Sequence, residues 1–191
     1  MRSCCYIIRA LLVIIAMPFS ARTQPFPELK LFPVYANTPW PTKKINNMIM
    51  DQRGLVWLTT YSAGLLRYDG NSIKQCISPD SISVTMHDLC IDKKGVLYIS
   101  SGEGLLTYDP LTGATTRYRH KNGNDNSLSD DDKPLPFVDS RNRVWVAGKG
   151  LQQLDPGTGK FINYQTPALP DNLPSFEYNR LKQMVEGTAG D

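Results

Sequence analysis

The sequence predicts an all-β fold built from three repeated four-stranded units and the start of a fourth. The first observation is a motif that opens with Asp51 and recurs at Asp92 and Asp139, 41 and then 47 residues further along. The second is that short runs of β-branched and aromatic residues alternate with clusters of Gly, Pro, Asn and Asp throughout these copies. Such runs are typical of strands joined by tight turns. A period of this length predicts stacked units, none of which buries its apolar faces alone.

Each copy begins with an acidic turn, at residues 51–54, 92–95 and 139–142. Aspartate caps its own turn through the side-chain carboxylate, and glycine tolerates positive φ, so these residues favour a hairpin between two short strands. The third copy has Asn142 where the first two have glycine. Asparagine is the next most tolerant residue in that conformation, so the turn is expected to be kept.

A strand with one aromatic residue follows each acidic turn, in the sequences VWLTT, LYISS and VWVAG. Trp57, Tyr98 and Trp145 occupy the equivalent place in the three strands. An aromatic residue that stacks on a ligand is the alternative interpretation, but regular placement favours packing between neighbouring units. We therefore expect all three rings in the core.

The rest of each copy predicts two further strands. A Gly-Leu corner, at residues 64–66, 104–106 and 150–151, leads into a strand that ends in Asp69, Asp109 or Asp155. After a turn come the fourth strands, at residues 72–77, 114–118 and 160–164. Four antiparallel strands at this period match the blade of a β-propeller, here an incomplete ring of about three blades.

The predicted organisation divides the chain into six segments. They are a signal peptide at 1–23, a lead-in segment at 24–44, blade 1 at 45–78, blade 2 at 79–119, blade 3 with a long connecting loop at 120–165, and a truncated start of blade 4 at 166–191. The acidic, amide-rich stretch at 122–132 is expected to be a solvated connection between blades.

The first residues have the layout of a secretory signal. Arg2 and Arg9 precede an apolar run at 10–19 that is too short to span a bilayer and is followed by small residues. Removal of the signal takes away Arg2, Arg9 and Arg22 and leaves 18 basic and 18 acidic residues. We therefore expect an exported mature chain of zero formal net charge that does not insert into the membrane, and its charge gives no reason to expect nucleic-acid binding.

The chemistry of a catalytic or metal site is missing from the sequence pattern. His87 and His120 lack metal-ligand spacing, and residues 122–132 lack the calcium-loop pattern, so neither a metal nor a cofactor is predicted. Cys76 and Cys90 remain after processing and are a candidate disulfide, with two separate half-buried thiols as the alternative. No nucleophile, base and stabiliser stand out together, so no catalytic residue is assigned.

The motifs D-x-x-G-x-x-W and G-L-L-x-Y-D, together with the linker that begins at Tyr118, resemble the two-component regulator propeller repeat over residues 45–191. The resemblance implies the N-terminal part of the periplasmic sensor region of a hybrid histidine kinase, with further blades and a kinase module in a longer chain. Tyr98, Asn142 and the stretch from Gln152 to Leu154 depart from the repeat pattern.

Propellers commonly bind ligands on the face made by the loops between strands two and three and the loops between blades. On that face the sequence places Tyr61, Ser62, Glu103 and Lys149 as candidate ligand-binding residues, although similar residues occur on any soluble loop. The resemblance implies a sensor of an extracellular signal, with an oligosaccharide as the ligand and a homodimer through the parent sensor. A propeller scaffold for protein partners and a fragment of a propeller lyase or hydrolase are the alternatives.

Overall fold

The computed structural model describes residues 41, 44–78, 85–164 and 187. The predicted signal peptide, nearly all of the lead-in segment and the predicted start of blade 4 lie outside the described residues. The described strands form three four-stranded antiparallel sheets, and no closed ring is seen among them. The all-β prediction is therefore confirmed.

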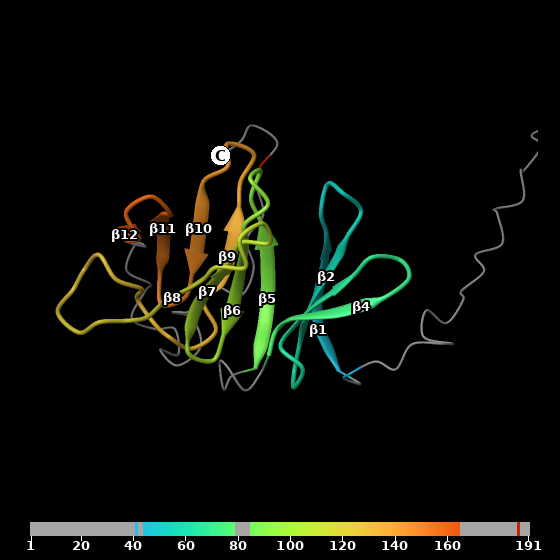
Figure 1. Ribbon diagram of the computed structural model, residues 1–191. Coiled ribbons are helices and arrows are strands. Elements are labelled where there is room, and N and C mark those ends of the chain that lie inside the picture. Colours follow the sequence, from blue (N-terminus) through green and yellow to red (C-terminus); the bar gives the residue numbers. More distant parts are fainter. Residues whose placement is uncertain (1–40, 42–43, 79–84, 165–186, 188–191) are drawn as a thin grey trace, which may run out of the picture. The chain divides into compact units, whose positions relative to one another are not determined.

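Each sheet is a simple meander in which the strands pair in chain order (Figure 1). The first sheet contains β1 (Ile45–Met50), β2 (Val56–Thr60), β3 (Leu65–Tyr68) and β4 (Ile73–Ile77). The second contains β5 (Met86–Ile91), β6 (Leu97–Ser101), β7 (Gly104–Tyr108) and β8 (Thr115–Tyr118). The third contains β9 (Leu135–Val138), β10 (Val144–Ala147), β11 (Leu151–Asp155) and β12 (Lys160–Tyr164). We call these sheets blades 1, 2 and 3.

The acidic turns join the first and second strands of each blade as predicted. The amide of Gly54 donates to the Asp51 carbonyl oxygen at 3.0 Å, and the same bond joins Gly95 to Asp92. In blade 3 Asn142 takes this place with a φ of 64° and donates to Asp139 at 2.8 Å. The left-handed conformation at that position is what makes glycine or asparagine necessary.

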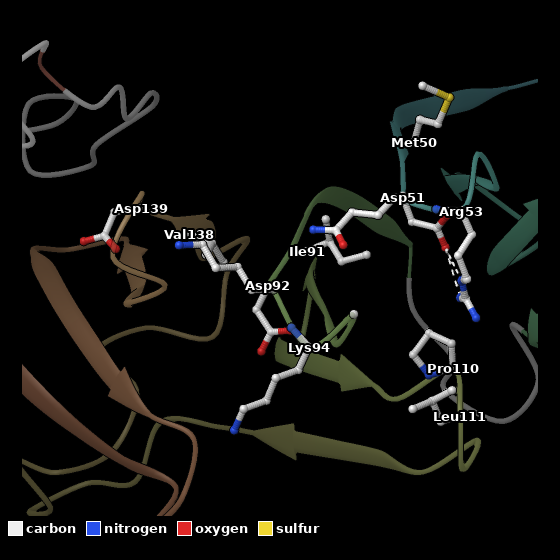
Figure 2. A pocket seen from close by; sticks show the side chains of 13 residues that line it. Met50, Asp51, Arg53, Ile91, Asp92, Lys94, Pro110, Leu111, Val138 and Asp139 are labelled. Carbon is white, nitrogen blue, oxygen red and sulfur yellow. Dashed lines mark hydrogen bonds and ion pairs between the residues drawn. The ribbon is translucent and has the colours of Figure 1, made fainter.

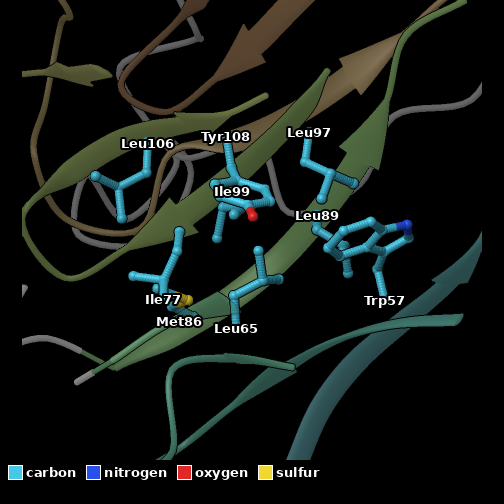
Figure 3. Packing of buried hydrophobic residues seen from close by; sticks show 9 residues of the cluster. All are labelled: Trp57, Leu65, Ile77, Met86, Leu89, Leu97, Ile99, Leu106 and Tyr108. Atoms are coloured by element: carbon cyan, nitrogen blue, oxygen red, sulfur yellow. The ribbon is translucent and has the colours of Figure 1, made fainter. Parts of the chain in front are cut away.

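The first hydrophobic core lies between blades 1 and 2 (Figure 3). Trp57 of blade 1 is fully buried there, with its ring centroid 5.9 Å from that of Tyr108 in blade 2. Leu65 and Ile77 from blade 1 meet side chains of blade 2 such as Leu97 in the same cluster. Neither sheet could bury these side chains alone, so the contact between the blades stabilises both.

The second core lies between blades 2 and 3 and repeats this plan. Tyr98 of blade 2 packs there with Val144, Val146 and Phe161 of blade 3. Trp145 is the third member of the aromatic series, but it is only partly buried. Its ring contacts Tyr164 of its own blade, at a centroid distance of 5.2 Å, and the Arg143 guanidinium. The prediction of a core position therefore holds fully for the first two rings and only in part for Trp145.

The connection between blades 2 and 3 is more ordered than its composition predicts. The prediction of a solvated segment holds for residues 121–126, which are exposed, but it is wrong for Ser127 and Leu128. Leu128 is 1% exposed and belongs to the second core. The side-chain amide of Gln152 donates to the Ser127 carbonyl oxygen at 3.0 Å and accepts from the Ser129 amide at 2.8 Å. The loop is therefore fixed to blade 3.

We predict that Gly104→Ala lowers the free energy of unfolding by about 2 kcal/mol or more. Gly104 has a φ of 104°, and a Cβ atom there would lie 2.2 Å from the Tyr118 carbonyl oxygen. Urea denaturation measures the change. Gly102→Ala in the same turn is the control, because a Cβ at Gly102 meets nothing within 4 Å. Equal stability of the two variants would contradict the prediction.

Candidate functional site

The three blades present their turns at two opposite ends. The turns after β1, β5 and β9 contribute to one cleft, so they lie at the same end, which we call the acidic-turn end. Because successive strands run antiparallel, the turns after β2, β6 and β10 lie at the other end of each sheet, together with the connections between blades. We call this the Gly-Leu end.

The structure places all four predicted ligand-binding residues in equivalent turns at the Gly-Leu end. Tyr61 and Ser62 follow β2, Glu103 lies between β6 and β7, and Lys149 lies between β10 and β11. The Tyr61 side chain is 56% exposed, and the Lys44 ammonium lies 4.5 Å from its ring centroid. The Tyr61 ring therefore already contacts the ammonium group of Lys44, the residue just before β1. Ligand binding by these residues stays a prediction.

Glu103 belongs to a charged network within blade 2. Its Oε2 atom accepts from the Arg117 guanidinium at 3.0 Å and also pairs with Arg119, both on or next to β8. Two cations thus share one carboxylate, and the Asp131 carboxylate, which accepts from the His120 amide, lies beside Gly104 in the same region. Glu103 would accept a hydrogen bond from a ligand only in competition with these guanidinium groups.

Polar residues near the starts of β1, β5 and β9, the first strands of the three blades, form a group that the sequence did not predict. Contacts between β1 and β5, and between β5 and β9, bring these strand starts together. His87 feels the charges of Lys44, Asp88, Asp132 and Lys133. Burial, and then the charge of Lys133, lower the pKa of His87. His87 is therefore expected to be neutral near pH 7, when its ring offers one donor and one acceptor.

The first strands are joined across blades at this end by side-chain bonds. The Asn46 amide donates to the Met86 carbonyl oxygen at 2.6 Å, and the Asn47 amide donates to Asp88 Oδ1 at 3.1 Å. The Thr59 hydroxyl donates to the His87 carbonyl oxygen. The only sequence signal for this group was the presence of polar residues in otherwise apolar strands, because their convergence depends on the stacking of the blades.

A cleft of about 440 Å³ lies at the acidic-turn end (Figure 2). It is lined by Met50, Ile91 and Val138, by the three acidic turns and by the exposed tip at Pro110 and Leu111. The carboxylates in its wall are already used by the fold. Asp51 Oδ1 accepts from the amides of Arg53 and Leu55, and Oδ2 accepts from the Arg53 guanidinium and the Trp57 indole. This cleft contains none of the four predicted ligand-binding residues.

The two cysteines are free thiols on different sides of blade 2. Cys76 packs against the core between blades 1 and 2, and Cys90 packs against the core between blades 2 and 3. The candidate disulfide is therefore not formed, since a sheet separates the two side chains. Burial raises the pKa of the Cys90 thiol to about 12, so it remains protonated at neutral pH.

Residues 44–78 and 85–164 contain no group of three or more His, Cys, Asp and Glu side chains arranged to hold a metal ion. The same residues include no helix of sufficient length and apolarity to cross a membrane. His120 uses its ring within the connecting loop, with Nδ1 2.7 Å from the Leu128 carbonyl oxygen and Nε2 3.0 Å from Asn122 Oδ1.

Solved structures resemble this fold. One is described as the extracellular domain of a hybrid two-component system from B. thetaiotaomicron, with 24% identity and a TM-score of 0.55 over 66% of this chain and 19% of that chain. Another is virginiamycin B lyase from Staphylococcus aureus, with 15% identity and a TM-score of 0.51 over 65% of this chain and 42% of that chain. These likenesses show a propeller-like fold. The chain spans about a fifth of the length of the first of these structures and about two fifths of the second.

Neither a protein-family model nor a curated protein matches the sequence. The resemblance to known proteins therefore stands on the arrangement of strands. The two structures above differ in what they are named for, a sensor domain and a lyase, so the shared fold does not by itself select a function.

We predict that the protein loses stability in acid through its turn carboxylates. Burial tends to raise the pKa of Asp51 and Asp139, but the indole of Trp57 or Trp145 and the turn amides outweigh it, and both pKa values lie below the ordinary 3.8. The amides of Ser72 and Asn71 lower the pKa of Asp69 to about 2. A lowered folded pKa gives stability that is present above about pH 4 and is lost as the pH falls through the folded pKa.

Urea denaturation between pH 7 and pH 2 tests this. The double variant Asp51→Asn and Asp139→Asn is expected to be less stable at pH 7 by about 2 kcal/mol or more, because the charged acceptors of two indoles are lost. Its further loss below about pH 4 should be smaller than that of the unchanged protein. Asp125→Asn is the control, since Asp125 contributes a backbone carbonyl to the described contacts. An equally steep acid decline in the double variant would refute the prediction.

Proposed function

We propose that the chain supplies the first blades of an extracytoplasmic β-propeller that senses an oligosaccharide for a two-component signalling protein. The observation that carries the proposal is the set of three equivalent turns at the Gly-Leu end. They present a tyrosine and a serine, a glutamate and a lysine at positions where the repeat imposes no common residue. The likeness to the extracellular domain of a hybrid two-component system supports the sensor class.

The chemistry of these turns suits a sugar. An exposed aromatic ring offers an apolar face to the C–H groups of a pyranose, while hydroxyl and ammonium groups donate to its oxygens. Tyr61, Ser62 and Lys149 are all exposed, so binding does not require the fold to open. The strand-start residues around His87 add polar groups near the innermost strands at the same end.

In this proposal the chain itself performs no reaction. Signalling would require further blades that close the ring, a membrane-spanning segment and a kinase module elsewhere in a longer protein. Such a protein would be exported to the periplasm and would signal as a homodimer. A stand-alone scaffold for protein partners is the remaining alternative, and it would not need the sugar-binding chemistry of the turns.

The test is calorimetric titration of the full-length protein with a panel of neutral and acidic oligosaccharides. The double variant Tyr61→Ala and Lys149→Ala is expected to weaken binding by about tenfold or more, because it removes a stacking ring and a donor. Its control is Leu111→Ala with Lys94→Ala, which removes an exposed apolar side chain and an exposed lysine at the acidic-turn end.

Equal affinity of the test and control variants would overturn the placement of the site. Failure of every oligosaccharide in the panel to bind would overturn the proposed ligand class. Cleavage of a bound sugar, seen as new products by mass spectrometry, would instead favour a lyase or hydrolase.

A further inference from the structure

A groove of about 210 Å³ lies where the outer strands of blades 2 and 3 face each other. Tyr118 at the end of β8 and Lys160 at the start of β12 form two of its walls, and Lys121, Asn124 and Asn126 of the connecting loop contribute further polar lining. None of the candidate ligand-binding residues of the Gly-Leu end lines this groove.

The connecting loop that builds the groove is held in place by its own hydrogen bonds. The Ser127 hydroxyl accepts from the Lys121 amide at 3.0 Å and donates to the Asn124 carbonyl oxygen at 2.8 Å. The Asn126 carbonyl oxygen accepts from the Phe161 amide at 2.9 Å, which joins the loop to the edge of β12. Because Leu128 anchors the loop in the core, the groove is formed before any ligand arrives.

The lining of the groove is basic. Arg117, Arg119, Lys121 and Lys160 contribute to it, and no Asp or Glu is among its lining residues. Glu103 pairs with both arginines and offsets one positive charge. Asp125, between the lining residues Asn124 and Asn126, and Asp131, which accepts from the His120 amide, are carboxylates of the same loop that do not line the groove. Lys121 and Lys160 are the cations of the groove that pair with no carboxylate within the described residues. Asp155 is the acidic residue whose charge reaches Tyr118, and its carboxylate is used by the Gly157 amide and the Thr158 hydroxyl.

An aromatic ring and two amide side chains complete the lining. The half-buried Tyr118 ring packs edge-on against Phe161 with a centroid distance of 5.6 Å. The β11–β12 turn lies close over this ring, since a Cβ at Gly159 would be 3.3 Å from Tyr118 Cε1. Amide, hydroxyl and ammonium groups around an aromatic wall can bind sugar hydroxyls, while the excess of cations selects a negative charge.

We propose that this groove binds a carboxylate or sulfate group of an acidic oligosaccharide, with Lys121 and Lys160 as the principal charged contacts. The choice of an oligosaccharide rests on the proposed function, whereas the choice of an anion rests on the lining of the groove itself. The groove depends on the long loop that sets the third repeat 47 residues after the second, compared with 41 for the previous spacing. It is therefore specific to the junction between blades 2 and 3.

The experiment titrates the full-length protein with a uronate trisaccharide, a sulfated disaccharide and a neutral trisaccharide, and compares each with inorganic sulfate. Calorimetry gives the affinities. Acetylation of lysines, followed by mass spectrometry, reports which ammonium groups each probe protects. The test variant is Lys121→Gln with Lys160→Gln. The control is Lys74→Gln with Lys94→Gln, which removes two exposed lysines, one on β4 and one in the turn after β5.

We expect an acidic oligosaccharide to bind about tenfold or more tightly than the neutral one and to protect Lys121 and Lys160 from acetylation. The test variant should abolish this preference, the control should keep it, and added salt should weaken it. Equal affinity for acidic and neutral sugars, or an undiminished preference in the test variant, would overturn the groove as the anion site.

The two proposals fail in different ways. If sugars bind and respond only to Tyr61 and Lys149, the groove inference is overturned and the proposed function is supported. If inorganic sulfate protects Lys121 and Lys160 but no sugar binds, the anion site is supported and the oligosaccharide class is overturned. Absence of both binding and protection would overturn the two together.

Discussion

The hydrogen bonds of the turn aspartates are the interaction on which the rest of the structure depends. In blades 1 and 3 a single carboxylate accepts from the amides of its own turn and from the indole of the next strand, at 3.1 Å for Trp57 and 2.9 Å for Trp145. In blade 2 the Tyr98 hydroxyl lies 3.4 Å from Asp92 Oδ2. The same side chain therefore closes the hairpin and orients the aromatic ring, which in blades 1 and 2 packs against the next blade.

The hydrogen bond between the turn aspartate and the indole offsets the cost of burying both groups. An indole N–H in an apolar core costs free energy unless it has an acceptor, and a buried carboxylate costs more. Each group satisfies the other, with the turn amides supplying the remaining donors. The ring can then be fully buried, as Trp57 is, and still leave no polar atom of its own unpaired. Replacement of Trp by Tyr is tolerated because the tyrosine hydroxyl reaches the same oxygen.

Much of the fold follows from residues whose role is local. The Asp turns, the left-handed position of Asn142 and the strand placement of the aromatic residues depend on spacings of a few positions, which the sequence shows directly. The bond from aspartate to indole was missed, although its signal, an aromatic residue six positions after each turn aspartate, recurs in all three copies. The half-exposed state of Trp145 was missed because its ring packs against Tyr164 and Arg143 of its own blade, which the repeat pattern does not indicate.

The features that could not be predicted depend on contacts across the chain. Gln152 looked like a defect of the third repeat, because Leu66 and Leu106 stand at its place in the other blades. Its buried side-chain amide instead forms hydrogen bonds with the backbone of Ser127 and Ser129 in the loop, as a neighbouring strand would. The composition of the loop predicts a solvated segment because most of its residues are polar. Leu128 is the one residue in its sequence that indicates entry into the core. Likewise, the group around His87 forms only when the inner strands of three blades meet.

Comparison of the three repeats within this one chain distinguishes positions at which the fold requires a particular residue from positions at which it does not. Where all three copies share a residue type, as at the turn aspartates, the side chain bonds to its own turn and to the aromatic residue of the next strand. Where the copies differ, as in the turns of unequal length that carry Tyr61, Glu103 and Lys149, stacking of the blades imposes no common choice. The longer connection before blade 3 extends this reasoning from a residue to a segment. Gln152 and Leu128 hold the loop against blade 3, and in our proposal the exposed side chains of the loop are those that contact a ligand.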